Sequence, residues 1–223
     1  MFSSTFTILL YKIMNLIETL NWRYATKQFE PIQKLSDDQL FQLTESLRLA
    51  PSSFGLQPRK FLVVTNPVIR EQLVWHSWGQ RQVADASHLI VLCAKDDVTE
   101  IDVQNYINDI ATTRWVPLEA LDGYRGMMNG TLESRTAEMR KSWAEKQVYI
   151  AQWFLLMAAA QLWIDACPME WFDAQAYDKV LWLEGSGYHS VVIVPVGYRS
   201  IDDAMASYAK VRYDADQVIE YIK

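Results

Sequence analysis

The sequence has little of what metal and disulfide sites require. Only two cysteines and three histidines occur among its 223 residues, and they show neither a CxxC nor an HExxH spacing, which argues against a zinc site. Cys93 and Cys167 are far apart in the chain. Two separated cysteines give no disulfide framework and are typical of a reducing compartment, so we expect a cytoplasmic protein.

Long apolar runs and an excess of basic residues are also missing. No apolar run reaches the roughly 18 residues that a bilayer-spanning helix requires. The net charge of -6 argues against non-specific nucleic-acid binding, which needs a basic face. Half of the residues are hydrophobic, which is enough for a sizeable core. We therefore expect neither a nucleic acid nor a membrane as a partner.

Three common active-site motifs are absent as well. There is no GxGxxG after a predicted strand and no P-loop, so neither a Rossmann dinucleotide site nor a phosphate loop of the usual kind is expected. The segment Gly185-Ser186-Gly187 lacks the GxSxG frame and a preceding strand. The sequence thus shows no nucleophile elbow.

The order of predicted elements favours an α+β fold. Continuous apolar runs predict buried strands over residues 61–65, 87–94 and 190–196. Helices are predicted between them, but not in regular βα alternation, which argues against a doubly wound sheet. We expect a single domain over residues 14–223. Residues 1–13 lack the features of a signal peptide and are interpreted as a disordered extension or the product of a mis-called start codon.

Three helical features carry further expectations. Helix-capping residues precede the segments beginning at Asp37 and Ala174. A long helix is predicted from about Leu132 to Trp163, and its second half, residues 149–162, is apolar nearly all round. That half should be buried in the domain or in a subunit interface. Before it, a glycine-punctuated segment around residues 123–130 is expected to be mobile.

Two basic pairs lie near opposite ends of the chain. Arg23 and Lys27 are four residues apart, and Lys210 and Arg212 are separated by one residue. A site that gathers all four cations would suit a phosphate, because arginine offers a bidentate fork and lysine a point charge. Each pair taken alone also fits an ordinary solvated surface.

The two basic pairs and two loop segments together form a recognisable sequence pattern. These segments are Ala50-Pro51-Ser52-Ser53-Phe54-Gly55-Leu56-Gln57-Pro58 and Pro168-Met169-Glu170-Trp171-Phe172-Asp173. With Arg23-Tyr24-Ala25-Thr26-Lys27 and the Lys210/Arg212 pair, they resemble the nitroreductase family of FMN enzymes. The segments Asp85-Ala86-Ser87-His88-Leu89-Ile90-Val91 and Lys146-Gln147-Val148-Tyr149-Ile150 also look like the oxygen-insensitive NAD(P)H branch of that family. The resemblance covers residues 14–213, nearly the whole chain.

The resemblance implies a fold and an activity. The fold would be a mixed, mainly antiparallel sheet flanked by helices, built as an intertwined homodimer. The activity would be that of an FMN-dependent oxidoreductase that takes a hydride from NADH or NADPH and reduces nitroaromatics, quinones or similar electron-poor acceptors by a ping-pong mechanism. No side chain would act as a catalyst, because the flavin carries the hydride. The alternative is a flavin-binding sensor or storage protein with little turnover.

The resemblance also implies which residues bind FMN. The phosphate would be held by the side chains of Arg23, Lys27, Lys210 and Arg212, and backbone contacts would come from Tyr24 and Ala25. A loop of the partner subunit would contribute Pro51, Ser52 and Ser53. The loop along the ring edge would contribute Pro168, Met169, Glu170 and Trp171, and an amide near the polar side of the ring would come from Gln82.

Two residues depart from the family pattern. Trp171 stands where relatives usually have glycine, and its backbone N–H is expected to donate to flavin N5 while its indole narrows the pocket or shifts the loop. Arg59 stands where relatives usually have a bulky aromatic residue. We expect Arg59 to face solvent, with a cation offered to a substrate or to NADPH as the alternative.

Overall fold

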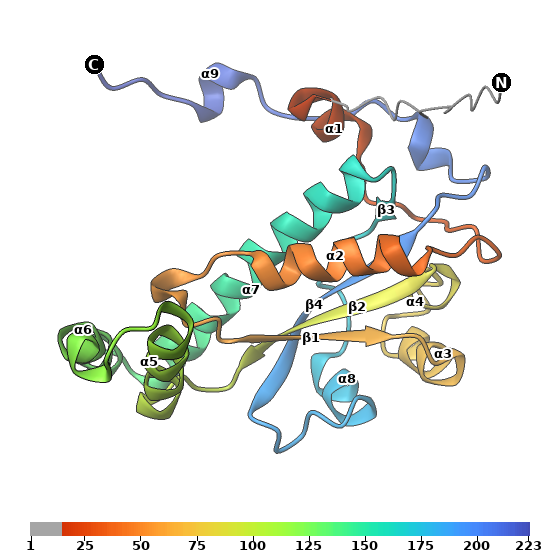
Figure 1. Cartoon of the computed structure of the whole chain (residues 1–223). Coiled ribbons are helices and arrows are strands. Elements are labelled where there is room, and N and C mark those ends of the chain that lie inside the picture. The colour runs from red at the N-terminus through yellow and green to blue at the C-terminus, as the bar shows by residue number, and fades with distance from the viewer. Residues whose placement is uncertain (1–14) are drawn as a thin grey trace, which may run out of the picture.

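A four-stranded antiparallel sheet forms the centre of the molecule. The computed structural model describes residues 15–223, and its strands lie in the order β1-β2-β4-β3 (Figure 1). Their bounds are Arg59–Val64 for β1, His88–Lys95 for β2, Asp165–Ala166 for β3 and Tyr188–Gly197 for β4. A parallel contact is limited to a bridge between Ala25 and Ala166. The predicted α+β fold with a mainly antiparallel sheet is therefore confirmed.

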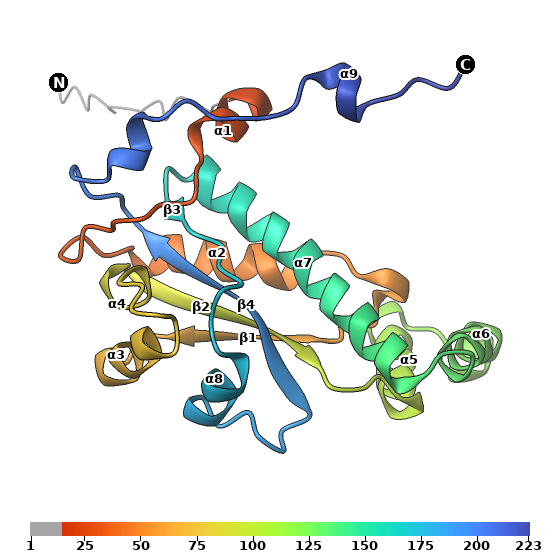
Figure 2. The same ribbon diagram turned by 180° about the vertical axis from the view of Figure 1, so that it is seen from behind.

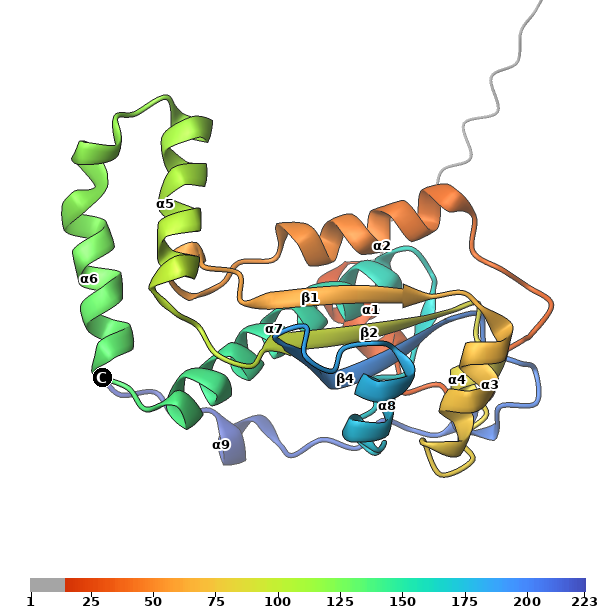
Figure 3. The same ribbon diagram turned by 90° about the horizontal axis from the view of Figure 1, so that it is seen from below.

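Helices cover both faces of the two central strands. Helices α2 (Asp37–Leu49) and α7 (Ala137–Gln161) cross one face, while α3 (Pro67–Trp75), α4 (Gln82–Asp85) and α8 (Ala174–Val180) lie on the other (Figures 2 and 3). Along β2, Ile90 and Leu92 pack with the first group, whereas Leu89 and Val91 pack with the second. Because both faces are buried, the strand sequence is continuously apolar and not alternating, as predicted.

The region predicted to be mobile is a regular helix. Helix α5 (Glu100–Arg114) ends at Trp115, whose φ of 56° is left-handed, and the chain returns through the 3₁₀ turn η2 (Leu118–Leu121) and α6 (Asp122–Glu133). The two helices stand away from the sheet (Figure 3). Met128 and Leu132 are buried in the core, and the three glycines of α6 face open space. Packing thus overrides the weak helix propensity of glycine.

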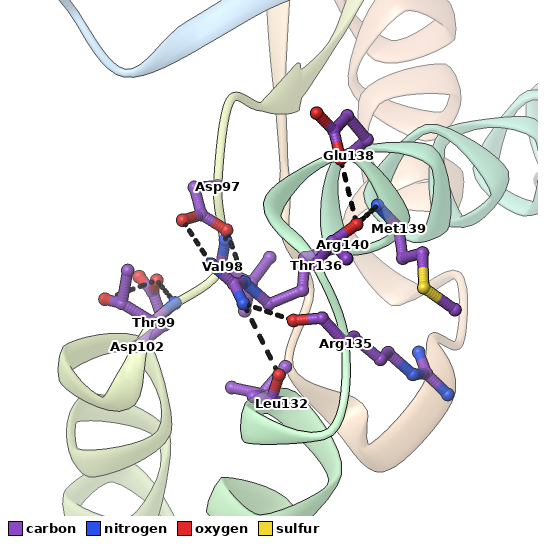
Figure 4. Close-up of polar contacts among 10 residues, drawn as sticks. All are labelled: Asp97, Val98, Thr99, Asp102, Leu132, Arg135, Thr136, Glu138, Met139 and Arg140. Atoms are coloured by element: carbon purple, nitrogen blue, oxygen red, sulfur yellow. Dashed lines mark hydrogen bonds and ion pairs between the residues drawn. The ribbon is translucent and has the colours of Figure 1, made fainter.

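Arg140 connects the segment from α5 to α6 with the start of α7. Its Nε and Nη2 donate to the two Asp97 carboxylate oxygens at 2.7 and 2.8 Å, and its Nη1 donates to the Arg135 carbonyl at 2.7 Å (Figure 4). Thr136 accepts a hydrogen bond from the Met139 N–H and caps α7 (Figure 4). The long helix therefore begins at Ala137, later than the predicted start near residue 132.

The remaining elements lie near the chain ends and in one loop. They are α1 (Leu16–Trp22), η1 (Ser53–Gly55), η3 (Ala204–Ser207) and α9 (Ala215–Val218). The C-terminal segment passes beside α1 in both views of the molecule (Figures 1 and 2). Within residues 15–223, no helix has the length and apolar character needed to cross a bilayer. The interpretation of residues 1–13 lies outside the described residues.

The expectation that Arg59 faces solvent is wrong. Its side chain is buried at the start of β1 and donates hydrogen bonds to three backbone carbonyls, those of Ala50, Pro51 (3.0 Å) and Gln147 (3.2 Å). Burial lowers the pKa of the guanidinium. The Gln147 side chain adds a fourth tie, because its Oε1 accepts from the Ser53 N–H at 2.8 Å. Arg59 is therefore a structural brace between the end of α2 and the middle of α7.

Replacing Arg59 by methionine should destabilise the fold. The substitution keeps most of the apolar stem but leaves three carbonyls without their donor, so we expect a loss of about 2–4 kcal/mol in the free energy of unfolding. Arg48→Met is the matched control, since Arg48 is exposed and pairs only with Glu45 on its own helix. Urea unfolding of both variants measures the difference. Equal midpoints for the two variants would contradict the bracing role.

Candidate functional site

Two cavities adjoin along the loop that follows α1. The first, of about 360 Å³, lies between this loop and the C-terminal segment. Its lining residues come from the two ends of the chain: Asn21, Trp22, Arg23, Tyr24, Ala25, Lys27, Met205, Ala206, Tyr208, Ala209, Lys210, Val211 and Arg212. The second, of about 340 Å³, is bordered by the 168–171 loop. Lys27 lines both cavities, so together they form one elongated site.

The first cavity gathers the four cations that the sequence singled out. Lys210 Nζ donates to the Leu20 carbonyl at 2.9 Å and to the Arg23 carbonyl, which fixes the C-terminal wall against the N-terminal one. Burial and repulsion by Arg212 lower the pKa of Arg23. Burial and repulsion by Arg23 and Arg212 lower the pKa of Lys210. The charges of Arg23 and Lys210 are thus disfavoured both by burial and by neighbouring cations.

No carboxylate neutralises this cluster. Among residues 15–223, no salt bridge joins Arg23, Lys27, Lys210 or Arg212 to an acidic side chain. Elsewhere in the same part of the chain, Arg199 and Asp165 form a 2.7 Å ion pair. Concentrated positive charge without a protein partner favours binding of an anion.

The N-terminal wall is held by one carboxylate that does not pair with these cations. Asp203 accepts from the Tyr24 hydroxyl at 2.9 Å and from the Lys27 N–H at 2.8 Å. Burial and this hydrogen bond raise the pKa of Tyr24. Burial alone would raise the pKa of Asp203, but the hydrogen bonds that it accepts hold that pKa below its ordinary value.

The second cavity has a mixed polar and aromatic lining. It is formed by Lys27, Gln80, Gln152, Pro168, Met169, Glu170 and Trp171. Glu170 accepts from the Tyr149 hydroxyl at 2.7 Å, and burial together with this bond raises the pKa of Tyr149. Met169 exchanges backbone hydrogen bonds with Ile193 of β4, which anchors the 168–171 loop to the sheet. The backbone of the loop is thus tied to the central sheet.

Trp171 presents its backbone and its indole differently. The side chain is 79% exposed and packs edge-to-face with Trp78, with 6.4 Å between ring centroids. Gln80 Nε2 donates to the Trp171 carbonyl at 3.2 Å. In the described part of the chain, the Trp171 N–H has no acceptor. The Trp171 N–H is therefore free to donate, and Trp171 is largely exposed at the border of the second cavity.

The single chain does not bring the predicted residues of the 51–53 loop to the cavities. This loop lies at the far end of α2 and borders neither cavity. Ser52 Oγ accepts from the Gln57 N–H at 2.9 Å, so it shapes the turn. The arrangement is compatible with delivery of the loop by a partner subunit, which stays a prediction.

Gln82 also lies away from the site. It is buried in α4, while Gln80, two residues earlier, lines the second cavity. In the single chain, the cavity is therefore lined by Gln80, and a flavin contact of Gln82 stays a prediction. Sequence reasoning missed Gln152, which gives no local signal on an apolar helix, and Asp203, whose only sequence signal is an acidic residue shortly before the second basic pair.

Known proteins resemble this chain over most of its length. The nitroreductase family model matches residues 20–198. YfkO of Bacillus subtilis, provisionally named an NAD(P)H nitroreductase, is 33% identical over 229 residues, covering 93% of this chain and 97% of YfkO. The 34% identical SERP2086 of Staphylococcus epidermidis, with the same provisional name, aligns over 219 residues and the same shares of the two chains.

Solved structures show the same fold. A provisionally assigned nitroreductase, ydfN of Bacillus subtilis, matches with a TM-score of 0.83 at 19% identity, over 92% of this chain and 98% of ydfN. A provisionally assigned nitroreductase from Exiguobacterium sibiricum, solved in complex with FMN, gives a TM-score of 0.78 at 20% identity, over 94% and 98% of the two chains. The match of the family model over most of the chain and the identity to YfkO confirm the resemblance: the chain belongs to the nitroreductase family.

Proposed function

We propose that the chain is an FMN-dependent oxidoreductase that uses NADH or NADPH to reduce electron-poor acceptors such as nitroaromatics and quinones. The observation that carries this proposal is the convergence of Arg23, Lys210 and Arg212 without a carboxylate partner. Family membership and the FMN complex of the Exiguobacterium sibiricum protein support flavin as the ligand. The provisional name of YfkO supports NAD(P)H as the donor.

The residues present fit FMN. A phosphate monoester carries about -1.5 to -2 charges near neutral pH, so it would offset the repulsion within the first cavity. Lys27 borders both cavities and lies where the cofactor would pass from phosphate to ring. The second cavity offers a flat ring the Trp171 N–H and two amide side chains, Gln80 and Gln152. We assign the phosphate to the first cavity and the isoalloxazine to the second.

The chain's own residues bind and orient in this mechanism. FMN, when bound, supplies hydride chemistry, accepting from the nicotinamide and delivering to the acceptor in two half-reactions. The cations hold the phosphate, and the bond between Tyr149 and Glu170 keeps the edge loop in place. No side chain has to act as a nucleophile. Donor and acceptor would occupy one open face in turn, which is ping-pong behaviour.

A flavin sensor or store with little turnover is the competing function. It would be favoured if the Trp171 indole occupied the space above the ring. That indole is 79% exposed and lies against Trp78, which supports access for an acceptor.

Anaerobic spectroscopy tests the proposed function directly. The purified protein should be yellow, with about one FMN per chain. NADH or NADPH alone should bleach the flavin band, and a quinone or nitroaromatic added afterwards should restore it, because the two half-reactions are separable. A colourless protein that ignores added FMN would contradict the cofactor assignment. A yellow protein that neither donor bleaches would favour the sensor or store.

The proposed enzyme is a homodimer. One side of α7 is buried in the core, but the other exposes a run of apolar side chains: Tyr149, Ile150, Trp153 and Phe154. Trp153 and Phe154 border a groove of about 280 Å³ against Ser46 of α2. The predicted apolar helix therefore has a face of the kind that a subunit interface covers. A dimer would also allow the 51–53 loop of one subunit to reach the cofactor of the other.

A charge placed on this face should separate the subunits. We expect dimers of the wild type and monomers of Phe154→Asp in sedimentation velocity, because an unpaired carboxylate would be buried at the interface. Ile201→Asp is the control, since Ile201 is 99% exposed on the loop that follows β4. The monomeric variant should also bind FMN more weakly. A wild-type monomer that holds FMN tightly would contradict a shared site.

Two substitutions of Trp171 separate its backbone from its indole. Trp171→Gly keeps the N–H, so it should leave flavin reduction by NAD(P)H within about tenfold of wild type and admit bulkier acceptors. Trp171→Pro removes the donor and should slow flavin reduction by roughly a further 10- to 100-fold. Single-turnover stopped-flow on both variants gives the comparison. If they behave alike, the backbone donor assignment is wrong.

A further inference from the structure

Asp203 joins the two walls of the cation-lined cavity without lining it. The residue is buried in the turn between β4 and η3. Its Oδ2 accepts from the Tyr24 hydroxyl and from the Lys27 and Gln28 N–H groups, at 2.9, 2.8 and 3.2 Å. Its Oδ1 accepts from the Met205 N–H at 3.1 Å. One carboxylate therefore satisfies donors on both sides of the cavity.

These contacts fix the positions of the two walls that carry the basic side chains of the cavity. Tyr24 and Lys27 belong to the N-terminal wall, and Met205 begins the segment that leads to Lys210 and Arg212 on the opposite wall. The Tyr24 ring is also packed against Arg199, whose guanidinium carbon lies 4.6 Å from the ring centroid. The hydroxyl of Tyr24 thus points to Asp203 from a constrained ring. Four hydrogen bonds to one buried carboxylate define the spacing of the walls.

We propose that Asp203 is a positioning residue that sets the phosphate geometry of the cavity. This inference rests on the proposed function, because it takes FMN as the ligand. A negative charge beside an anion site weakens anion binding if it acts only through its charge. A positioning role predicts the opposite, since removing the carboxylate would let the walls separate. The sign of the change in affinity therefore distinguishes the two roles.

The test compares Asp203→Asn with Asp202→Asn. Asp202 is the exposed neighbour, and among the described residues its side chain makes no hydrogen bond, so its substitution measures the effect of charge alone. Asparagine at 203 would put an amide N–H where donors already converge, or leave several of them unpaired. We expect Asp203→Asn to raise the dissociation constant for FMN by about tenfold or more. Asp202→Asn should leave it unchanged or lower it.

Riboflavin, which lacks the phosphate, separates positioning from general loosening. The Asp203→Asn protein should lose affinity for FMN but keep that for riboflavin within about threefold of wild type. Equal losses for the two flavins would mean that Asp203 only supports the fold. If the Asp203→Asn and Asp202→Asn proteins bind FMN equally well, Asp203 has no positioning role. If wild type itself ignores FMN, the proposed function fails first.

Tyr24→Phe keeps the test decisive if Asp203→Asn does not fold. This variant retains the carboxylate and the backbone but deletes one of its donors. We expect FMN affinity to fall about three- to tenfold, with riboflavin affinity unchanged. Unchanged FMN affinity in a folded Tyr24→Phe protein would overturn the proposal in that case.

Discussion

The site depends on one constraint: several positively charged side chains are held close together in the first cavity. Burial disfavours the charges of Arg23 and Lys210, and repulsion by Arg212 lowers the pKa of both further. Such a cluster is unfavourable unless the surrounding structure enforces it or an anion occupies it. Here the structure enforces it through neutral and backbone contacts, among them the bonds from Lys210 to the Leu20 and Arg23 carbonyls.

The sheet explains why residues from both chain ends can meet. Strand β4 ends at Gly197 next to β3, and β3 bridges to Ala25 in the loop that follows α1. The segment that leaves β4 therefore continues beside that loop. Asp203 lies 179 residues from Tyr24 in sequence yet bonds to its hydroxyl. The cavity is consequently a product of strand order, and its cations need no local motif beyond their two basic pairs.

Much of the fold could be predicted from sequence because local signals and burial agreed. The apolar run over residues 87–94 indicated a strand covered on both faces, and β2 is such a strand. Asp173 caps α8 as its position suggested, by accepting from the Ala176 N–H. The four cations and the 168–171 loop were also predictable, through the family pattern that they share. The structure brings both groups to adjoining cavities.

What failed depended on distant contacts. Helix α6 was missed because its glycines disfavour a helix, whereas packing of Met128 and Leu132 stabilises one. Arg59 was placed in solvent because a lone arginine gives no sign of the carbonyls that it binds, which come from α2 and α7. The role expected for Gln82 stays a prediction: local sequence does not distinguish it from Gln80, and the start of α4 decides which of the two lines the second cavity.

In the proposed function, the unpaired cations hold the phosphate ester of a flavin. Calorimetric titration of the apo-protein with FMN and with riboflavin, at low salt and at about 1 M salt, tests it most directly. We expect FMN to bind roughly 100-fold or more tightly than riboflavin at low salt, and this advantage to shrink as salt rises. Equal affinities for the two flavins, or an FMN advantage that salt does not change, would contradict it.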